Sequence, residues 1–206
     1  MKKTELVFIL DRSGSMMGLE KDTIGGYNSM LERQKNAEQE VYVTTVLFDD
    51  KYELLHNRVN LKEVKPITEK EYYVRGCTAL LDAVGKTVNL VKSSADADTS
   101  VIFVITTDGY ENASREFNHA QIQRMIRMQE EKGWEFIFLG ANIDSAQTAE
   151  KMGIRRERAT DYVADSKGVG LNFQAISKAV SNFMSTGEVE DDWADECRAY
   201  ADSKRG

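Results

Sequence analysis

The sequence predicts an α/β protein: a doubly wound, mainly parallel six-stranded sheet with one antiparallel edge strand and helices on both faces. Apolar segments of strand length alternate with segments of helical spacing, as expected of βα units. The segments 6–10 and 100–107 are almost continuously apolar, which is typical of central parallel strands. The segments 41–48 and 52–59 are joined by a short turn, which requires an antiparallel hairpin.

The first half of the chain also contains two predicted helices and a long connection. Apolar residues recur at helical spacing over about 22–35, although Gly25 and Gly26 weaken this helix by about 1 kcal/mol each relative to alanine. Two interpretations of the glycines stay open: another backbone, such as a metal-site loop, passes closely, or the helix starts irregularly. Residues 60–77 show no period and form a long connection, which leads into a helix over about 80–93.

The second half of the chain alternates strands and helices. Asn118 is predicted to begin a helix, because it forms a capping box with Gln121, and Gly133 ends that helix. Asp144 similarly resembles the cap of a short helix that ends at Gly153. The remaining predicted elements are strands at 134–139 and 159–164 and a helix that ends at Gly187.

We expect one principal domain over residues 1–187 and an acidic C-terminal helix and tail over 188–206. A chain of 206 residues can bury roughly 70% of its unfolded surface without a disulfide or structural metal. The C-terminal segment is rich in Asp and Glu, yet Val189, Trp193 and Cys197 keep a helical spacing. This spacing predicts an amphipathic helix packed on the domain, with a detachable partner-binding helix as the alternative.

Composition and charge exclude several classes of protein. The 27 basic and 34 acidic residues give a net charge of −7, which opposes a phosphate backbone, so we expect no nucleic-acid partner. The first apolar run stops at Asp11 and is therefore too short for the core of a signal peptide. No segment approaches the roughly 20 apolar residues of a membrane span. With only two cysteines, a disulfide framework is not expected. We therefore expect a cytoplasmic protein in which Cys77 is a small buried residue rather than a reactive thiol.

Oxygen-bearing side chains follow the first strand at alternate positions. Asp11, Ser13 and Ser15 lie in a turn where Gly14 allows the backbone to curl, so that their oxygens can converge. Hard divalent cations such as Mg2+ prefer about six oxygen ligands. The alternative is a polar turn whose serine caps a helix.

Two further residues extend this candidate site. Asp108 directly follows the second apolar strand, and Thr78 lies at the amino end of a predicted helix, where it either contacts a metal or caps the helix. In doubly wound sheets, ligands gather at the carboxyl ends of strands, where the strand order reverses. Two carboxylates in one place repel each other, and a bound cation removes that conflict.

The D-x-S-x-S motif, the separate Thr and the separate Asp together resemble the metal-ion-dependent adhesion site of von Willebrand factor A domains, a fold also seen in integrin inserted domains. The resemblance implies that Ser13 and Ser15 bind Mg2+, or Mn2+ or Ca2+, directly. It implies direct binding by Thr78 when a ligand is present, and binding by Asp11 and Asp108 either directly or through water.

The resemblance covers roughly residues 4–185 and is greatest to the compact stand-alone versions of bacteria and phages. It implies a non-enzymatic protein-binding module in which one coordination position accepts an Asp or Glu side chain of a partner protein. Prokaryotic relatives often cooperate with ring-forming ATPases or serve in stress and phage systems, so such components are among the expected partners.

The residues around the motif are candidates for a rim that sets partner specificity. Exposed aromatic and arginine side chains often dominate binding energy. For the tyrosines of the 60–77 connection, the alternative is that they cover the sheet. The candidate rim residues are Arg12, Met16, Met17, Tyr72, Tyr73, Arg75, Tyr110, Glu111 and Arg115.

A metal-dependent phosphohydrolase with Asp11 as nucleophile is the alternative function. A strand that ends in Asp also describes haloacid-dehalogenase-like phosphatases, but those have a second Asp two residues later, where this chain has Ser13. The phosphate-binding motif G-x-x-x-x-G-K-[ST] is absent from the sequence. We therefore expect no enzymatic activity. A structural subunit with a vestigial site is a third possibility, which the five intact residues disfavour.

Overall fold

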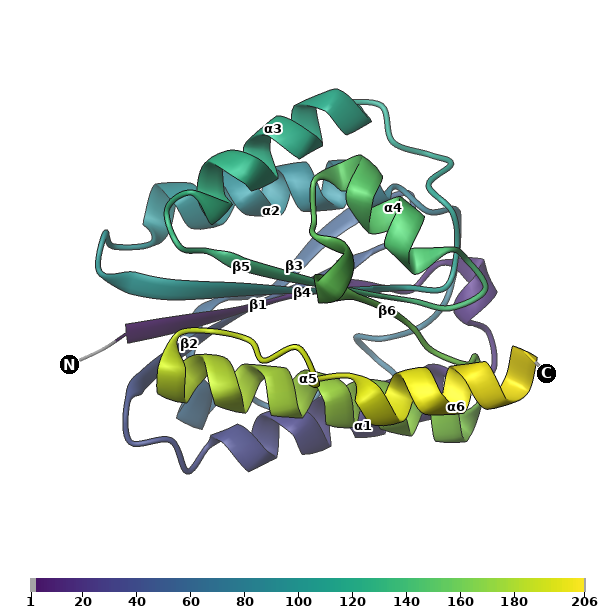
Figure 1. The fold of residues 1–206 in the computed structure, drawn as a ribbon, viewed down its shortest axis with the longest axis horizontal. Coiled ribbons are helices and arrows are strands. Elements are labelled where there is room, and N and C mark those ends of the chain that lie inside the picture. Colours follow the sequence, from purple (N-terminus) through teal and green to yellow (C-terminus); the bar gives the residue numbers. More distant parts are fainter. Residues whose placement is uncertain (1–2, 206) are drawn as a thin grey trace.

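A computed structural model of the chain describes residues 3–205; Met1, Lys2 and Gly206 lie outside this range. Within it, six strands form one sheet in the order β3-β2-β1-β4-β5-β6 (Figure 1). All neighbouring strands are parallel except β2 and β3, which form the antiparallel edge. The predicted fold class is confirmed. The strands are β1 (Lys3–Asp11), β2 (Glu40–Phe48), β3 (Tyr52–Asn60), β4 (Thr99–Thr107), β5 (Glu135–Gly140) and β6 (Ala159–Asp161).

Helices cover both faces of the sheet (Figure 1). Helices α2, α3 and α4 lie on one face and α1, α5 and α6 on the other, and each layer buries its own apolar cluster against the sheet. Within residues 3–205, no helix is both long enough and apolar enough to cross a bilayer. The helices are α1 (Glu20–Gln34), α2 (Leu80–Ser94), α3 (His119–Glu130), α4 (Ser145–Met152), α5 (Ser166–Thr186) and α6 (Asp195–Arg205), with 3-10 turns η1 (Gly14–Met16), η2 (Leu61–Glu63) and η3 (Arg156–Arg158).

The helix ends follow the capping chemistry of the sequence. Asn118 and Gln121 form the predicted capping box of α3, and the Asp144 side chain accepts a hydrogen bond at the start of α4. The left-handed Gly187 ends α5. Two strands differ from prediction by three residues: β1 begins at Lys3 instead of residue 6, and β6 ends at Asp161 instead of residue 164. After β6, Asp165 accepts a hydrogen bond from the Gly168 N–H (2.7 Å) and begins α5.

The C-terminal segment packs on the domain within its described residues, 188–205. Trp193 and Cys197 are buried in the apolar cluster of the α1 and α5 layer. The Trp193 indole N–H donates to the Glu157 carbonyl at 3.1 Å, and α6 contacts both α5 and β6. Trp193 lies in the turn before α6, so the helix begins later than the apolar spacing predicts.

The two adjacent glycines of α1 have different surroundings. A Cβ atom on Gly26 would lie 2.2 Å from Cδ2 of Phe173 in α5, whereas a Cβ atom on Gly25 would meet no atom within 4 Å. The close approach at Gly26 is therefore made by a side chain and not by the backbone of a metal-site loop. Gly25 lies inside α1, five residues after its start at Glu20, so neither an irregular start nor a close approach accounts for this glycine.

Alanine substitutions at these two positions should change stability in opposite directions. We expect Gly25→Ala to stabilise the protein by up to about 1 kcal/mol, because alanine favours the helix. We expect Gly26→Ala to destabilise it by about 1–3 kcal/mol, because the Phe173 ring must move. Urea unfolding of both variants measures this, and destabilisation by both to the same degree would contradict the packing described.

Candidate metal centre

The candidate centre lies where the strand order of the sheet reverses. β1 and β4 are neighbours at the middle of the sheet, and the chain continues outward from them in opposite directions. Both strands are parallel, so Asp11 at the end of β1 and Asp108 directly after β4 reach the same edge. This edge is the ligand-binding position of doubly wound sheets, as the sequence predicts.

A chain of hydrogen bonds joins the motif residues. The Ser13 N–H donates to Asp11 Oδ1 at 2.6 Å, and the Ser13 and Ser15 hydroxyls lie 3.0 Å apart. Ser15 Oγ donates to Asp108 Oδ1 at 2.5 Å, and Thr107 Oγ1 donates to Asp11 Oδ2 at 2.5 Å. The 3-10 turn η1 provides the curl that brings both serines to one side. The loop after β1 therefore contacts the carboxylate that follows β4.

Thr78 reaches the same place from the 60–79 connection. A Cβ atom built on Gly109 would lie 3.2 Å from Ser15 Oγ and 3.3 Å from Thr78 Oγ1. The first free N–H groups of α2 are bound by other residues: Leu81 donates to Glu111 and Asp82 donates to Ser114. No side-chain hydrogen bond forms at the N-cap of α2. The Thr78 side chain therefore does not cap α2, and the capping alternative is wrong.

The two carboxylates are held in an environment that opposes their charge. Burial raises the pKa of Asp11 to about 6, and the neighbouring charge of Asp108 adds to this shift. Burial also raises the pKa of Asp108. Among the described residues, Asp108 Oδ2 is buried and has no hydrogen-bond partner. A buried oxygen without a partner is costly, so this atom favours a cation at the site.

The oxygen set fits a hard divalent cation. It combines two carboxylates with the hydroxyls of Ser13, Ser15 and Thr78, which are ligands suited to Mg2+, Mn2+ or Ca2+. Across residues 3–205, no group of three His, Cys, Asp or Glu side chains is placed to hold a metal. A cation at this edge would therefore depend on the hydroxyls.

Arg12 is not a rim residue, which corrects the prediction made for it. Its side chain is fully buried and donates to Asp49 Oδ2 at 3.0 Å and to Glu53 Oε2 at 2.7 Å. Arg75 Nε donates to the same oxygen of Asp49 at 2.7 Å. Burial opposes ionisation of Asp49, but hydrogen bonds from Arg75 and the Lys51 N–H, with the charge of Arg12, hold its pKa below the usual value.

Asp49 therefore joins the two loops that carry the candidate ligands. Three backbone hydrogen bonds reinforce this junction: Gly14 N–H to Gly76 O at 3.2 Å, Arg75 N–H to Arg12 O at 2.9 Å and Ala79 N–H to Asp49 O at 2.9 Å. This role of Asp49 is not predicted from the sequence, because an acidic pair after a strand indicates only a turn. The available signal was the charge of Arg12, because a cation next to a metal motif needs an acidic partner.

Met16 and Tyr72 are also buried, so the prediction that they form part of the rim is wrong. The Tyr72 hydroxyl donates to the Asp11 carbonyl at 2.6 Å, and Met16 Sδ lies 3.9 Å from the Tyr162 hydroxyl. Both side chains therefore support the motif loop from inside the protein. For Tyr72, the alternative of covering the sheet is the correct one.

Glu111 and Asp82 fasten the loop that follows Asp108. The Glu111 carboxylate accepts hydrogen bonds from the N–H groups of Leu81, Ala113 and Ser114, so it is engaged within the protein. Asp82, in the first turn of α2, accepts three backbone N–H groups, from residues 115, 116 and 117, each at 2.9 Å. Burial opposes ionisation of Asp82, but these three donors hold its pKa below the usual value.

Asp82→Asn should therefore destabilise the protein in a pH-dependent way. We expect a loss of about 1–3 kcal/mol at pH 7, since hydrogen bonds to a charged group are replaced by weaker ones. A carboxyl whose folded pKa is lowered stabilises above its unfolded pKa, so the difference from wild type should shrink as the pH falls below about 4. Urea unfolding from pH 7 to pH 3 tests this, with the exposed Asp98→Asn as control. A pH-independent difference would contradict it.

The remaining candidate rim residues reach the surface around the centre. Large apolar side chains are exposed on each of the loops that carry the ligands: Met17 (74%), Tyr73 (42%) and Tyr110 (60%). Arg75 is partly exposed and stacks on the Tyr73 ring. Arg115 is exposed on the loop after Asp108.

Cys77, expected to be buried, is exposed beside Thr78. Only Cys197, the other cysteine, is a buried apolar residue of the kind predicted.

The fold is similar to that of several solved structures, whereas no protein-family model and no curated protein matches the sequence. A von Willebrand factor type A protein from Catenulispora acidiphila has a TM-score of 0.62 and 14% identity, over 86% of this chain and 42% of that one. Proximal thread matrix protein 1 from the mussel byssus has a TM-score of 0.60 and 12% identity, over 85% and 45%. The PilB minor pilin from Streptococcus sanguinis has a TM-score of 0.64 and 12% identity, over 89% and 62%.

The chain spans less than half the length of the first two of these structures and less than two thirds of the pilin. Similarity at such low identity concerns the fold alone. The chain therefore has a von Willebrand factor type A-like fold, a Rossmann-like sheet wrapped by helices.

Proposed function

We propose that this protein is a divalent-cation-dependent protein-binding module with a metal-ion-dependent adhesion site. Asp11, Ser13, Ser15, Thr78 and Asp108 would hold Mg2+, or Mn2+ or Ca2+. A partner protein would supply an Asp or Glu side chain as a further ligand. When bound, the cation would supply positive charge that attracts this carboxylate.

The observation that carries the proposal is the state of Asp108. Its Oδ2 atom is buried without a hydrogen-bond partner among the described residues, while its Oδ1 atom accepts from Ser15. The hydroxyls of Ser15 and Thr78 approach the neighbouring Gly109 so closely that a Cβ atom there would lie 3.2 Å and 3.3 Å from them. A polar cradle with one uncompensated carboxylate oxygen suits a cation that binds through oxygen.

The surroundings of the centre support a protein as the partner. Met17, Tyr73 and Tyr110 place exposed apolar area on the loops around the ligands. Aromatic, Met and Arg side chains are enriched at protein interfaces, and Tyr and Arg are among the residue types that most often dominate the binding energy.

The contacts of Asp11 argue against the phosphohydrolase alternative. Both carboxylate oxygens accept hydrogen bonds, from the Ser13 N–H and from Thr107 Oγ1, and the side chain is buried. A nucleophile needs a free oxygen facing its substrate and a general acid nearby. Position 13 carries a serine where that chemistry needs an acid. We therefore propose binding without a reaction.

Selection of peptides in the presence of Mg2+ tests the proposed function. A library of displayed random peptides is bound to the immobilised protein in Mg2+ and eluted with EDTA. We expect the recovered peptides to contain an essential Asp or Glu and to lose binding to Thr78→Ala. Thr78→Ser, which keeps the hydroxyl, is the matched control and should retain binding. Peptides that bind equally well in EDTA, or equally well to Thr78→Ala, would contradict the proposal.

A further inference from the structure

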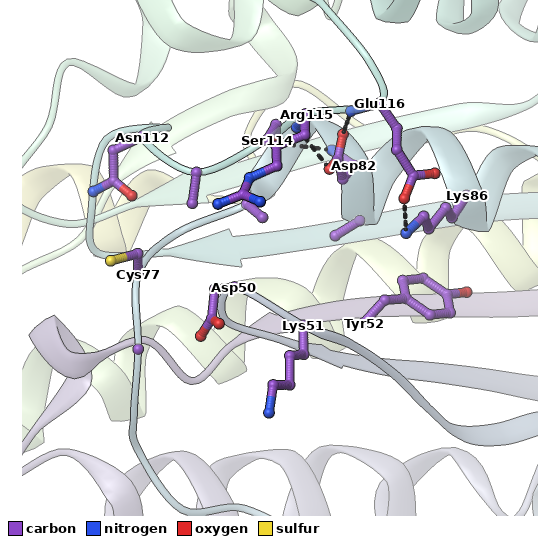
Figure 2. Close-up of a pocket in the computed structure, with 14 residues that line it drawn as sticks. Asp50, Lys51, Tyr52, Cys77, Asp82, Lys86, Asn112, Ser114, Arg115 and Glu116 are labelled. Carbon is purple, nitrogen blue, oxygen red and sulfur yellow. Dashed lines mark hydrogen bonds and ion pairs between the residues drawn. The ribbon is translucent and has the colours of Figure 1, made fainter.

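A cavity of about 970 Å3 opens beside the candidate metal centre (Figure 2). Gly76, Cys77 and Ala79 form one wall of the cavity, so the segment that carries Thr78 separates it from the metal centre. The turn at 50–52 and the loop at 112–116 form walls on opposite sides (Figure 2). Ligand-binding clefts commonly have volumes of about 300–1,000 Å3, so the cavity can receive part of a bound molecule.

Three of the six charged side chains that line the cavity are engaged within the protein. The Asp82 carboxylate accepts three backbone N–H groups, and Lys86 forms an ion pair with Glu116 at 2.7 Å. Within residues 3–205, the guanidinium of Arg115 and the ammonium of Lys51 make no hydrogen bond or ion pair. In Figure 2, Arg115 extends over the cavity, whereas Lys51 points away from Arg115. Arg115 and Lys51 are thus two separate cations of the cavity lining, and Arg115 is the one that extends over the cavity.

Asp50 does not compensate the charge of Arg115. No ion pair joins these two side chains among the described residues. Asp50 Oδ1 lies against Gly76, where a Cβ atom would be only 2.0 Å away, so this carboxylate stays on the wall next to the metal centre. The backbone N–H of Arg115 donates a hydrogen bond to Asp82, so the backbone from which the guanidinium extends is held in place.

We propose that this cavity receives the stretch of the partner chain next to its cation-binding carboxylate, and that Arg115 pairs with a second carboxylate in that stretch. The inference rests on the proposed function, because it places the partner by its contact with the centre. The cavity is lined mainly by charged and polar residues, which suits an extended polypeptide better than an apolar small molecule. A guanidinium can bind a carboxylate through two parallel hydrogen bonds, which adds specificity.

This arrangement makes the partner an acidic segment with two carboxylates that have separate roles. One carboxylate depends on the cation and on the five residues of the centre. The other depends on Arg115 and is independent of the cation. A segment with one carboxylate would bind through the centre alone and therefore more weakly.

Charge reversal at Arg115 tests the inference with the peptides recovered in Mg2+. We expect Arg115→Glu to weaken their binding at least tenfold, measured by fluorescence anisotropy in Mg2+. Changing one Asp or Glu of the peptide to Arg should restore binding to this variant. Arg124→Glu, at an exposed position on α3, is the matched control and should change binding less than twofold. The Arg115 side chain makes no hydrogen bond or ion pair within residues 3–205, so the variant should fold.

The outcomes separate this inference from the proposed function. Mg2+-dependent peptides that bind wild type and Arg115→Glu equally would overturn the inference and leave the proposed function standing. If binding to Arg115→Glu is weaker and no change of a peptide Asp or Glu to Arg restores it, the proposed pairing of Arg115 with a second carboxylate is also overturned. Peptides that bind without Mg2+ would contradict the proposed function itself, and the inference with it.

Discussion

Asp49→Ala is expected to lower the free energy of unfolding by about 3–5 kcal/mol, because it removes the fully buried carboxylate that pairs with the buried Arg12 guanidinium. Arg12 then keeps its ion pair with Glu53, whose side chain is 44% exposed. Asp49 Oδ2 accepts from both Arg12 Nε and Arg75 Nε, and the side chains of Arg12 and Asp49 are fully buried. For a chain of this size, the melting temperature should fall by about 10 °C. The same change should weaken Mg2+ binding, since Asp49 joins the loops of Ser13 and Thr78.

Asp50→Ala is the matched control for this prediction. Asp50 is the neighbouring acidic residue but is exposed, and surface substitutions usually change stability by less than about 0.5 kcal/mol. Thermal and urea unfolding of both variants gives the comparison. Similar stability of the two variants would mean that the ion pairs of Asp49 do not hold the loops together.

Trp193→Ala is expected to cost about 3–5 kcal/mol, the usual range for removing a large buried aromatic side chain. Trp193 is 1% exposed, and its indole N–H donates to the Glu157 carbonyl. Tyr110→Ala, which removes an aromatic side chain that is 60% exposed, should change stability by less than about 0.5 kcal/mol. Urea unfolding measures both.

The result for Trp193 also decides how the C-terminal segment behaves. A loss of about 3 kcal/mol or more would make residues 188–205 an integral part of the folded domain. A loss below about 1 kcal/mol would mean that the segment separates easily from β6 and α5, as a detachable partner-binding helix would.

Most of the fold could be predicted because the apolar patterns are strong. The uninterrupted runs of β1 and β4 and the short connection between β2 and β3 indicate central strands and an antiparallel edge. The capping box at Asn118 and the glycine at 187 locate helix ends, because these residue types satisfy particular backbone groups. Strand boundaries were predicted less closely, as at β6, which ends at Asp161 before Asp165 caps α5 through the Gly168 N–H.

The candidate ligands could be predicted because they follow strands that must meet at one edge of the sheet. The direction in which individual loop side chains point could not be predicted. Arg12 and Met16 lie between or beside the motif residues, yet both are buried, Met16 in η1 and Arg12 in its ion pair with Asp49. Tyr72 and Tyr73 are adjacent, but of the two only Tyr72 is buried. The sequence could not distinguish them, because the connection has no periodicity from which to infer a buried face. Such burial depends on contacts between loops that are distant in sequence.

Mg2+ titration of chelator-stripped protein tests the central claim most directly, with the melting temperature as the readout. Mg2+ at about 100 times its Kd should add about 2.7 kcal/mol to the stability of wild type, a rise of about 5–10 °C in melting temperature. Asp11→Asn keeps the oxygen that accepts the Ser13 N–H but removes the charge, so we expect it to fold and to show no such rise. The exposed Asp98→Asn should respond as wild type does. No rise in wild type, or an equal rise in Asp11→Asn, would contradict a cation site at this edge of the sheet.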